Sequence, residues 1–169
     1  MSDYDQKALE ALAAAVGAAL LHTGQRLATA ESCTGGWVAQ SLTAIAGSSD
    51  WFERGFVTYS NAAKQEMLGV LPETLDRHGA VSEATAAAMA AGALRHSHAH
   101  WALAITGIAG PGGGSADKPV GTVCFGWAGP DDCIAVESCR FAGSREEVRG
   151  QSVAYALAGF LKRCVTMTA

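Results

Sequence analysis

Residues 26–36 read Arg26-Leu27-Ala28-Thr29-Ala30-Glu31-Ser32-Cys33-Thr34-Gly35-Gly36, and this stretch decides the fold. Its first five residues predict a short β-strand, and the next six form a polar, glycine-rich turn. The residues that follow have the apolar spacing of a helix. A strand that leads through a polar turn into a helix is typical of α/β proteins, whose sites lie in loops beyond the strand ends.

The rest of the chain continues this alternation of helices and strands. Further strands are predicted at residues 51–59, 101–106, 121–128 and 133–140. Helices are predicted at residues 4–23, from 37 to the stop at 47, after 60–61, from 72, at 83–95 and from the capping box at 144–147. Helices alternate with strands early and a strand pair comes late. We therefore expect a three-layer α/β/α domain around a mixed β-sheet.

Length and composition favour one ordinary globular enzyme domain. The 169 residues suit a single domain spanning 1–169, with 49% apolar and 17% charged residues. A net charge of −4 without a lysine-rich block argues against nucleic-acid binding. No signal peptide and no membrane-spanning segment is expected, and five cysteines without a C-x-x-C pair fit reduced thiols. These features predict a cytoplasmic protein.

Two neighbouring residues in the polar turn are candidate nucleophiles. Ser32 lies between a strand and a helix, where the free N–H groups at the helix start could stabilise an oxyanion. Cys33 is the alternative, because a helix N-terminus lowers the pKa of a thiol. The turn is also compatible with a plain helix cap followed by packing glycines.

A lysine is the better candidate for the general base. Lys64 follows the strand that ends at Tyr59, and it lies in the first turn of a helix, where burial would lower its pKa. Tyr59 could relay a proton or donate to an oxyanion. The His96-x-His98-x-His100 pattern could bind a metal, but it follows a long helix and is better explained as a solvated end. We expect no metal and no cofactor.

Two further features could bind an anion. Residues 107–119 hold five glycines and two prolines, and successive free N–H groups in such a turn can form an anion nest. Arg145 and Arg149 lie four residues apart at the start of the last helix, on one face. A flexible lid and a pair of exposed arginines are the respective alternatives.

Four long motifs, in this order, resemble the CinA C-terminal domain family. They are Ala30-Glu31-Ser32-Cys33-Thr34-Gly35-Gly36, then Gly55-Phe56-Val57-Thr58-Tyr59-Ser60-Asn61-x-x-Lys64, then Ala104-Ile105-Thr106-Gly107-Ile108-Ala109-Gly110-Pro111-Gly112-Gly113, then Lys118-Pro119-Val120-Gly121-Thr122-Val123. The closing Phe141-x-Gly143-x-Arg145-x-x-Val148-Arg149 also fits. The match runs from about Leu9 to Cys164, so we expect the stand-alone form of the domain.

The resemblance implies a serine amidohydrolase that converts nicotinamide mononucleotide into nicotinic acid mononucleotide and ammonia. It implies that Ser32 is the nucleophile, that Lys64 is its base and that Tyr59 assists. Thr106 and the N–H groups near Thr34, Gly35 and Gly36 would orient or stabilise the amide oxygen. The remaining substrate-binding candidates are Asn61, Gly110, Gly112, Gly113, Gly114, Ser115, Lys118, Arg145 and Arg149.

Two rival functions stay open at this stage. A noncatalytic nucleotide-binding domain would use the same loops without releasing ammonia, and a cysteine hydrolase would depend on Cys33. We also expect a homo-oligomer, to whose interface Trp37, Trp51 and Phe52 could contribute. The expected partner is a small-molecule nucleotide.

Overall fold

Five strands form one mixed sheet at the centre of the molecule, in the order β2-β1-β3-β4-β5. In this computed structural model, which describes residues 4–167, the strands are β1 Leu27–Glu31, β2 Phe52–Val57, β3 Trp101–Gly107, β4 Thr122–Ala128 and β5 Ile134–Arg140. β1 is parallel to both of its neighbours, whereas β4 is antiparallel to β3 and β5.

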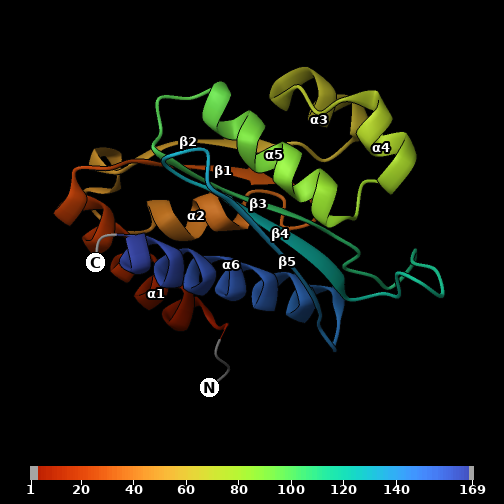
Figure 1. The fold of residues 1–169 in the computed structure, drawn as a ribbon. Helices are drawn as coiled ribbons and strands as arrows, with labels where there is room; N and C mark the ends of the chain where they lie inside the picture. Colours follow the sequence, from red (N-terminus) through yellow and green to blue (C-terminus); the bar gives the residue numbers. More distant parts are fainter. Residues whose placement is uncertain (1–3, 168–169) are drawn as a thin grey trace.

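Helices cover both faces of the sheet, which makes three layers (Figure 1). One face carries α1 Gln6–Thr23, α2 Trp37–Thr43 and α6 Arg145–Met167, and the other carries α3 Asn61–Leu68, α4 Pro72–His78 and α5 Glu83–Arg95. Each face has its own apolar cluster, one built with α1 and α6 and the other with α5. The expected α/β/α architecture around a mixed sheet is confirmed.

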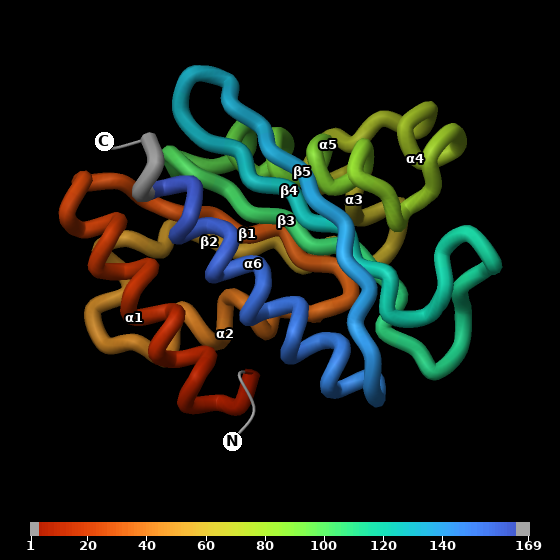
Figure 2. Tube along the Cα trace, turned by 60° about the horizontal axis from the view of Figure 1, so that its bottom comes forward, coloured from red at the N-terminus to blue at the C-terminus, as the bar shows by residue number. Residues whose placement is uncertain are grey.

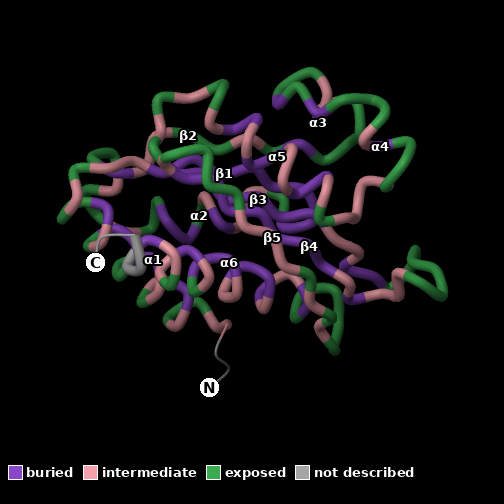
Figure 3. The backbone as a smooth tube through the Cα atoms, in the orientation of Figure 1, coloured by how far each residue is buried: buried purple, intermediate pink, exposed green. Residues whose placement is uncertain are grey.

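Burial follows this layering. The most deeply buried backbone runs through the sheet, and the loops are exposed (Figure 3). All five residues of β1 are buried, because helices cover the strand on both faces and neighbouring strands flank it on both sides. The glutamate that ends β1 therefore lies in the interior.

The predicted element boundaries differ from the observed ones where local chemistry ends an element. The first helix begins at Gln6 rather than at residue 4, because the Asp5 side chain caps it by accepting the Ala8 N–H at 2.9 Å. β2 is shorter than the predicted 51–59, because a 3₁₀ turn, η1 Ser48–Asp50, leads into it. Beyond its end the chain turns toward the cap of α3.

Trp51 does not contribute to a surface. Only 2% of it is exposed, and its ring packs against Gly17 of α1, where a Cβ would approach within 2.7 Å. It therefore cannot be part of an oligomer interface, contrary to the expectation. Trp37 and Phe52 are half-buried. Within residues 4–167, no helix has the length and apolar character needed to span a bilayer.

Candidate active site

The carboxyl ends of three parallel strands meet at one edge of the sheet. Glu31 at the end of β1 is in register with Val57 of β2 and with Ile105 of β3. The residues that follow these three therefore lie side by side, Ser32 and Thr58 beyond their strands and Thr106 still within β3. This edge brings Ser32 together with Thr106 and with the segment that leads to Lys64.

Ser32 and Lys64 form a close pair. Lys64 Nζ lies 3.0 Å from Ser32 Oγ and donates to the Thr58 carbonyl at 2.8 Å. Lys64 is only 1% exposed, and burial lowers its pKa because the charged amine loses its hydration. No carboxylate within the described part of the chain forms a salt bridge with it. Lys64 can therefore supply a neutral amine that takes a proton.

Helix α3 holds the lysine in this position. Its cap is Ser60, whose hydroxyl accepts the Ala63 N–H at 3.0 Å, so the helix begins directly after the cap. Lys64 is the fourth residue of the helix, and its side chain turns inward across the end of β1. The predicted position of Lys64 near the start of a helix is what brings its amine to Ser32.

A cavity of about 230 Å³ opens onto this pair. Seven of the residues that line it were singled out in the sequence, namely Ser32, Cys33, Tyr59, Asn61, Lys64, Thr106 and Arg145. Ala80 and Val81 also line the cavity. Residues from five separate segments of the chain thus converge on one space.

Arg145 and Tyr59 are joined at this cavity. Arg145 donates to the Tyr59 hydroxyl at 2.9 Å and to the Gly110 carbonyl at 2.7 Å. Tyr59 is 60% exposed, so the pair lies where the cavity meets solvent. The Tyr59 hydroxyl accepts from the guanidinium and keeps its own proton available to donate.

Thr106 lies on the inner side of the cavity and is 1% exposed. Its hydroxyl donates to the Ala80 carbonyl at 2.7 Å. Because that bond uses the only hydroxyl proton, the Thr106 oxygen faces a ligand as an acceptor.

Most of the polar groups in the turn after Ser32 already have partners. The Gly35 N–H donates to the Ser32 carbonyl at 3.0 Å, and the Gly36 N–H donates to the Glu31 carboxylate at 3.1 Å. Thr34 is fully buried, and its hydroxyl also donates to Glu31, at 2.7 Å. Thr34, Gly35 and Gly36 do not line the cavity, although they were predicted to face the substrate.

Arg149 lies one helical turn beyond Arg145 but has different partners. Its Nε donates to the Cys33 carbonyl at 3.0 Å, and its Nη2 donates to the Thr34 carbonyl at 2.8 Å. Its guanidinium also lies 5.3 Å from the centre of the Trp37 ring. Of the predicted arginine pair, only Arg145 lines the cavity.

Most of the glycine-rich segment between β3 and β4 lies away from the cavity and projects from the molecule (Figure 2). Its tip, Gly112–Ser115, is exposed. Lys118 donates to the His78 carbonyl at 2.8 Å, and its N–H donates to the Ser115 hydroxyl at 3.1 Å. Only the start of the segment, Gly107 and Ala109, lines the cavity.

The cysteine next to Ser32 is a poor nucleophile in this setting. Burial raises the pKa of the Cys33 thiol to about 12, since the thiolate would lose its hydration. The backbone N–H of Cys33 offsets part of this rise in pKa, Glu31 raises the pKa further, and Arg149 and Lys64 lower it slightly. The thiol is therefore protonated at neutral pH, unlike a thiol that is activated at a helix N-terminus.

Comparison with known proteins shows the family of this chain. A family model described as the CinA C-terminal domain matches residues 9–164. The chain belongs to this family. It is 58% identical over 143 residues to the nicotinamide-nucleotide amidohydrolase PncC of Escherichia coli K12, with 84% of this chain and 86% of that protein covered. The PncC of Enterobacter agglomerans is 51% identical over 160 residues, with 95% and 98% covered.

Solved structures of the CinA family have the same fold. A competence/damage inducible protein from Agrobacterium tumefaciens is 48% identical and superposes with a TM-score of 0.89, covering 91% of this chain and 94% of that one. A CinA superfamily protein from Klebsiella pneumoniae is 41% identical with a TM-score of 0.90, covering 94% and 98%.

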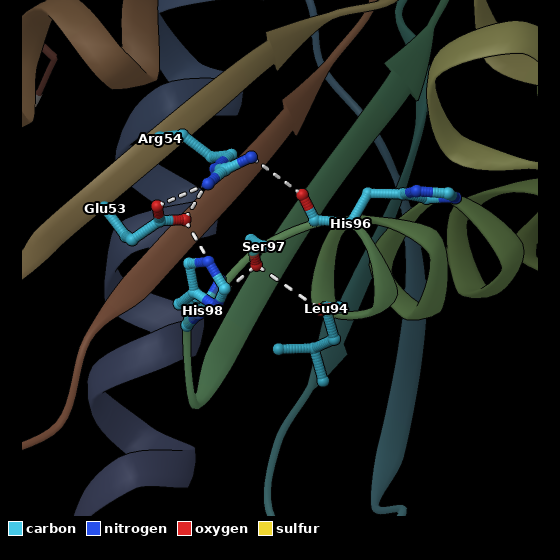
Figure 4. A network of polar contacts seen from close by, with 7 residues as sticks. Glu53, Arg54, Leu94, His96, Ser97 and His98 are labelled. Carbon is cyan, nitrogen blue, oxygen red and sulfur yellow. Dashed lines mark hydrogen bonds and ion pairs between the residues drawn. The ribbon is translucent and has the colours of Figure 1, made fainter.

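The histidines at the end of α5 lie in a separate network of this CinA-family chain (Figure 4). The Glu53 carboxylate accepts from the Arg54 guanidinium and from the backbone N–H of His98. Arg54 also donates to the backbone carbonyl of His96. His100 Nδ1 accepts the Arg26 N–H at 3.1 Å. No cluster of histidine, cysteine and carboxylate side chains within the described residues is arranged to hold a metal ion.

Sequence reasoning missed two parts of the site. The sequence analysis gave Glu31 no role, yet its carboxylate accepts four hydrogen bonds from the turn and the start of α2. A charged residue in the last position of a buried strand is the signal that could have identified it. The other part, Ala80 and Val81, carries no such signal, because both side chains are apolar and chemically inert.

Proposed function

We propose that this chain hydrolyses the carboxamide of nicotinamide mononucleotide, giving nicotinic acid mononucleotide and ammonia. The observation that carries the proposal is the buried Lys64 amine 3.0 Å from Ser32 Oγ, at the floor of a cavity. A serine beside a neutral lysine is a nucleophile with its own base, which suits acyl transfer. The choice of substrate is supported by the PncC relatives, which are named for a nicotinamide-nucleotide amidohydrolase activity.

In the first half of the reaction, neutral Lys64 takes the proton of Ser32 as Oγ attacks the carboxamide carbon. The carbonyl oxygen gains negative charge, and a backbone N–H in the turn after Ser32 stabilises it. The Lys64 ammonium then gives its proton to the amide nitrogen. The carbon–nitrogen bond breaks, ammonia leaves, and Ser32 carries the acyl group as an ester.

In the second half, a water molecule takes the place of ammonia. Lys64 removes a proton from the water as its oxygen attacks the ester carbon. The bond to Ser32 Oγ breaks, Lys64 returns the proton to that oxygen, and the carboxylate product leaves. One base thus serves both halves, and the proposed reaction needs no cofactor and no metal.

The other cavity residues bind and orient the substrate. The Thr106 hydroxyl donates its proton to the Ala80 carbonyl, so its oxygen accepts a hydrogen bond from the carboxamide NH₂. Arg145 and Tyr59 lie at the mouth, where they contact the nucleotide part, and Asn61 lines the same wall. Arg145 supplies the positive charge that a phosphate requires.

Ammonia release from nicotinamide mononucleotide tests the proposal. We expect the native chain to release ammonia with a chelator present, and Ser32→Ala and Lys64→Met to lose activity by about three or more orders of magnitude. The exposed Ser49 and Lys7 provide matched controls, Ser49→Ala and Lys7→Met, which should keep native rates. A folded native chain that binds the nucleotide without releasing ammonia would favour the binding-domain alternative.

A further inference from the structure

Two charged side chains other than Lys64 form hydrogen bonds with the turn at residues 32–36. The first is Glu31, which is 1% exposed. Its carboxylate accepts hydrogen bonds from the Thr34 hydroxyl at 2.7 Å and from the N–H groups of Gly36, Val38 and Ala39 at 3.1, 3.0 and 2.9 Å. The Glu31 carboxylate thus connects the turn to the first residues of α2.

This arrangement changes which groups can stabilise an oxyanion. The amides at the start of α2 donate to Glu31 and are not available to the substrate. Gly36 adopts a φ of 98°, which glycine tolerates and which lets the chain enter the helix over the carboxylate. The helix start, where sequence reasoning placed the oxyanion donors, therefore serves as an anchor.

The second side chain is Arg149, which reaches the turn from α6. It donates to the carbonyls of Cys33 and Thr34, the two residues in the middle of the turn. Its guanidinium also lies 5.3 Å from the centre of the Trp37 ring, which limits its freedom to move. Glu31 and Arg149 thus hold the turn through its N–H groups and its carbonyls respectively.

One N–H group of the turn borders the cavity without donating to an oxygen. Cys33 lines the cavity, and its N–H donates to no carbonyl or carboxylate within residues 4–167, although it lies against the sulfur of its own side chain. The Ser32 carbonyl, in the same peptide unit, accepts the Gly35 N–H at 3.0 Å. Because a trans peptide is planar, with its C=O and N–H pointing in opposite directions, this bond fixes the direction of the Cys33 N–H.

We propose that Glu31 and Arg149 are positioning residues that clamp residues 32–36, so that the Cys33 N–H is held as the oxyanion donor beside Ser32. The inference rests on the proposed role of Ser32 as the nucleophile. It gives Arg149 a function in the transition state in place of substrate binding. Neither side chain touches the substrate, and both act through the backbone.

Steady-state kinetics of Glu31→Gln and Arg149→Lys test the clamp. Each variant keeps the size of the side chain but loses part of the hydrogen-bond pattern, since Gln offers one acceptor oxygen and Lys lacks the planar fork. We expect kcat to fall by about 100-fold or more, as when an oxyanion donor is displaced. KM should stay within about threefold, and the pH at which activity rises should not move, because Lys64 is untouched.

The matched controls are Glu53→Gln and Arg26→Lys. Glu53 also accepts a backbone N–H, from His98, and Arg26 also donates to a carbonyl, that of Ser49 at 3.1 Å. Arg26 directly precedes β1 and Glu53 lies near the start of β2, so both are at the opposite end of these strands from Ser32. They should keep the native kcat, which separates the clamp from a general loss of polar contacts.

A second readout does not depend on the substrate. A fluorophosphonate labels an activated serine and places its oxygen where an oxyanion would lie. Ser32 of the native chain should be labelled quickly, and Glu31→Gln and Arg149→Lys should be labelled about 100-fold more slowly. Native labelling without turnover of nicotinamide mononucleotide would reject the proposed substrate while leaving the clamp open to the same comparison.

Three results would overturn the clamp. One is a kcat in both variants within about threefold of the two controls. Another is a large rise in KM at constant kcat for Arg149→Lys, which would make Arg149 a substrate ligand. The third is native labelling rates in both variants. If Glu31→Gln does not fold, Arg149→Lys carries the test alone, because it keeps the positive charge next to Trp37.

Discussion

The environments of Ser32 and Cys33 are the reason that the proposal makes Ser32, rather than Cys33, the nucleophile. The two are neighbours in the same turn, and both line the same cavity. Burial lowers the pKa of the Lys64 amine and raises the pKa of the Cys33 thiol, so the same desolvation makes a usable base of one group and an inert thiol of the other. The sequence left this choice open, because burial depends on the whole fold.

The pH dependence of activity should report Lys64. Only the neutral amine accepts a proton from Ser32, so kcat/KM should rise with pH and level off above the pKa of Lys64. Because burial lowers that pKa, the plateau should begin below the value of about 10.4 that is usual for lysine. Measuring kcat/KM between neutral and alkaline pH checks this. A rate that follows an ordinary lysine pKa would contradict the role of burial.

The pH dependence of the free energy of unfolding should also report the lowered pKa of Lys64. Between the lowered pKa of Lys64 in the folded chain and its ordinary value, the unfolded chain binds more protons. The free energy of unfolding should therefore rise with pH across that window because of Lys64. Denaturant unfolding at several pH values should show this contribution in the native chain and in Lys7→Met, and its loss in Lys64→Met.

Replacing Cys33 tests the proposal that this thiol is not the nucleophile. Cys33→Ala should keep kcat within about threefold of the native value, because the backbone N–H remains and the protonated thiol takes no part. Removing the buried sulfur should lower the free energy of unfolding by about 1 kcal/mol. Loss of ammonia release in a folded Cys33→Ala protein, or rapid inactivation by a thiol alkylator, would return the nucleophile's role to Cys33.

At the scale of elements, the sequence predicted the helices, the strands and their alternation. It also predicted that Lys64 belongs with Ser32, since both follow strands and the motif spacing is distinctive. It did not predict the partners of the turn, because Glu31 and Arg149 meet there from β1 and α6, which lie more than a hundred residues apart in the chain. Such contacts depend on packing that local periodicity does not encode.

The contact between α3 and α5 should control the position of Lys64. Gly92 in α5 packs so closely on the end of α3 that a Cβ there would lie 2.1 Å from the Leu68 carbonyl oxygen. Gly92→Ala should therefore push α3 outward, lowering the free energy of unfolding by about 1–3 kcal/mol and reducing kcat with it. Thermal unfolding and ammonia release measure the two effects.

The adjacent residue provides the control for this contact. Ala91→Ser changes the same helix by one small group and should alter neither the free energy of unfolding nor kcat appreciably. A Gly92→Ala protein as stable and as active as Ala91→Ser would show that α3 tolerates the shift.

At the scale of the whole molecule, the mixed sheet explains why one edge carries the chemistry. Three parallel strands end together there, and helices bury the central strands β1 and β3 on both faces. A lysine from α3 can therefore lie shielded from water beside the serine that follows β1. The strand order could not be predicted, since strand propensity does not say which strands pair. The homo-oligomer stays a prediction. Light scattering tests it against the monomer mass of 17.3 kDa, and Trp51 is not part of any such interface.

Trapping the acyl-enzyme tests the central claim most directly. The native chain would be mixed with nicotinamide mononucleotide, quenched in acid within the first turnover, and analysed by peptide mass spectrometry. We expect a nicotinate mononucleotide ester on Ser32 of the native chain, and no such ester in Ser32→Ala. Release of ammonia by the native chain with no adduct at Ser32, together with turnover by Ser32→Ala, would contradict it.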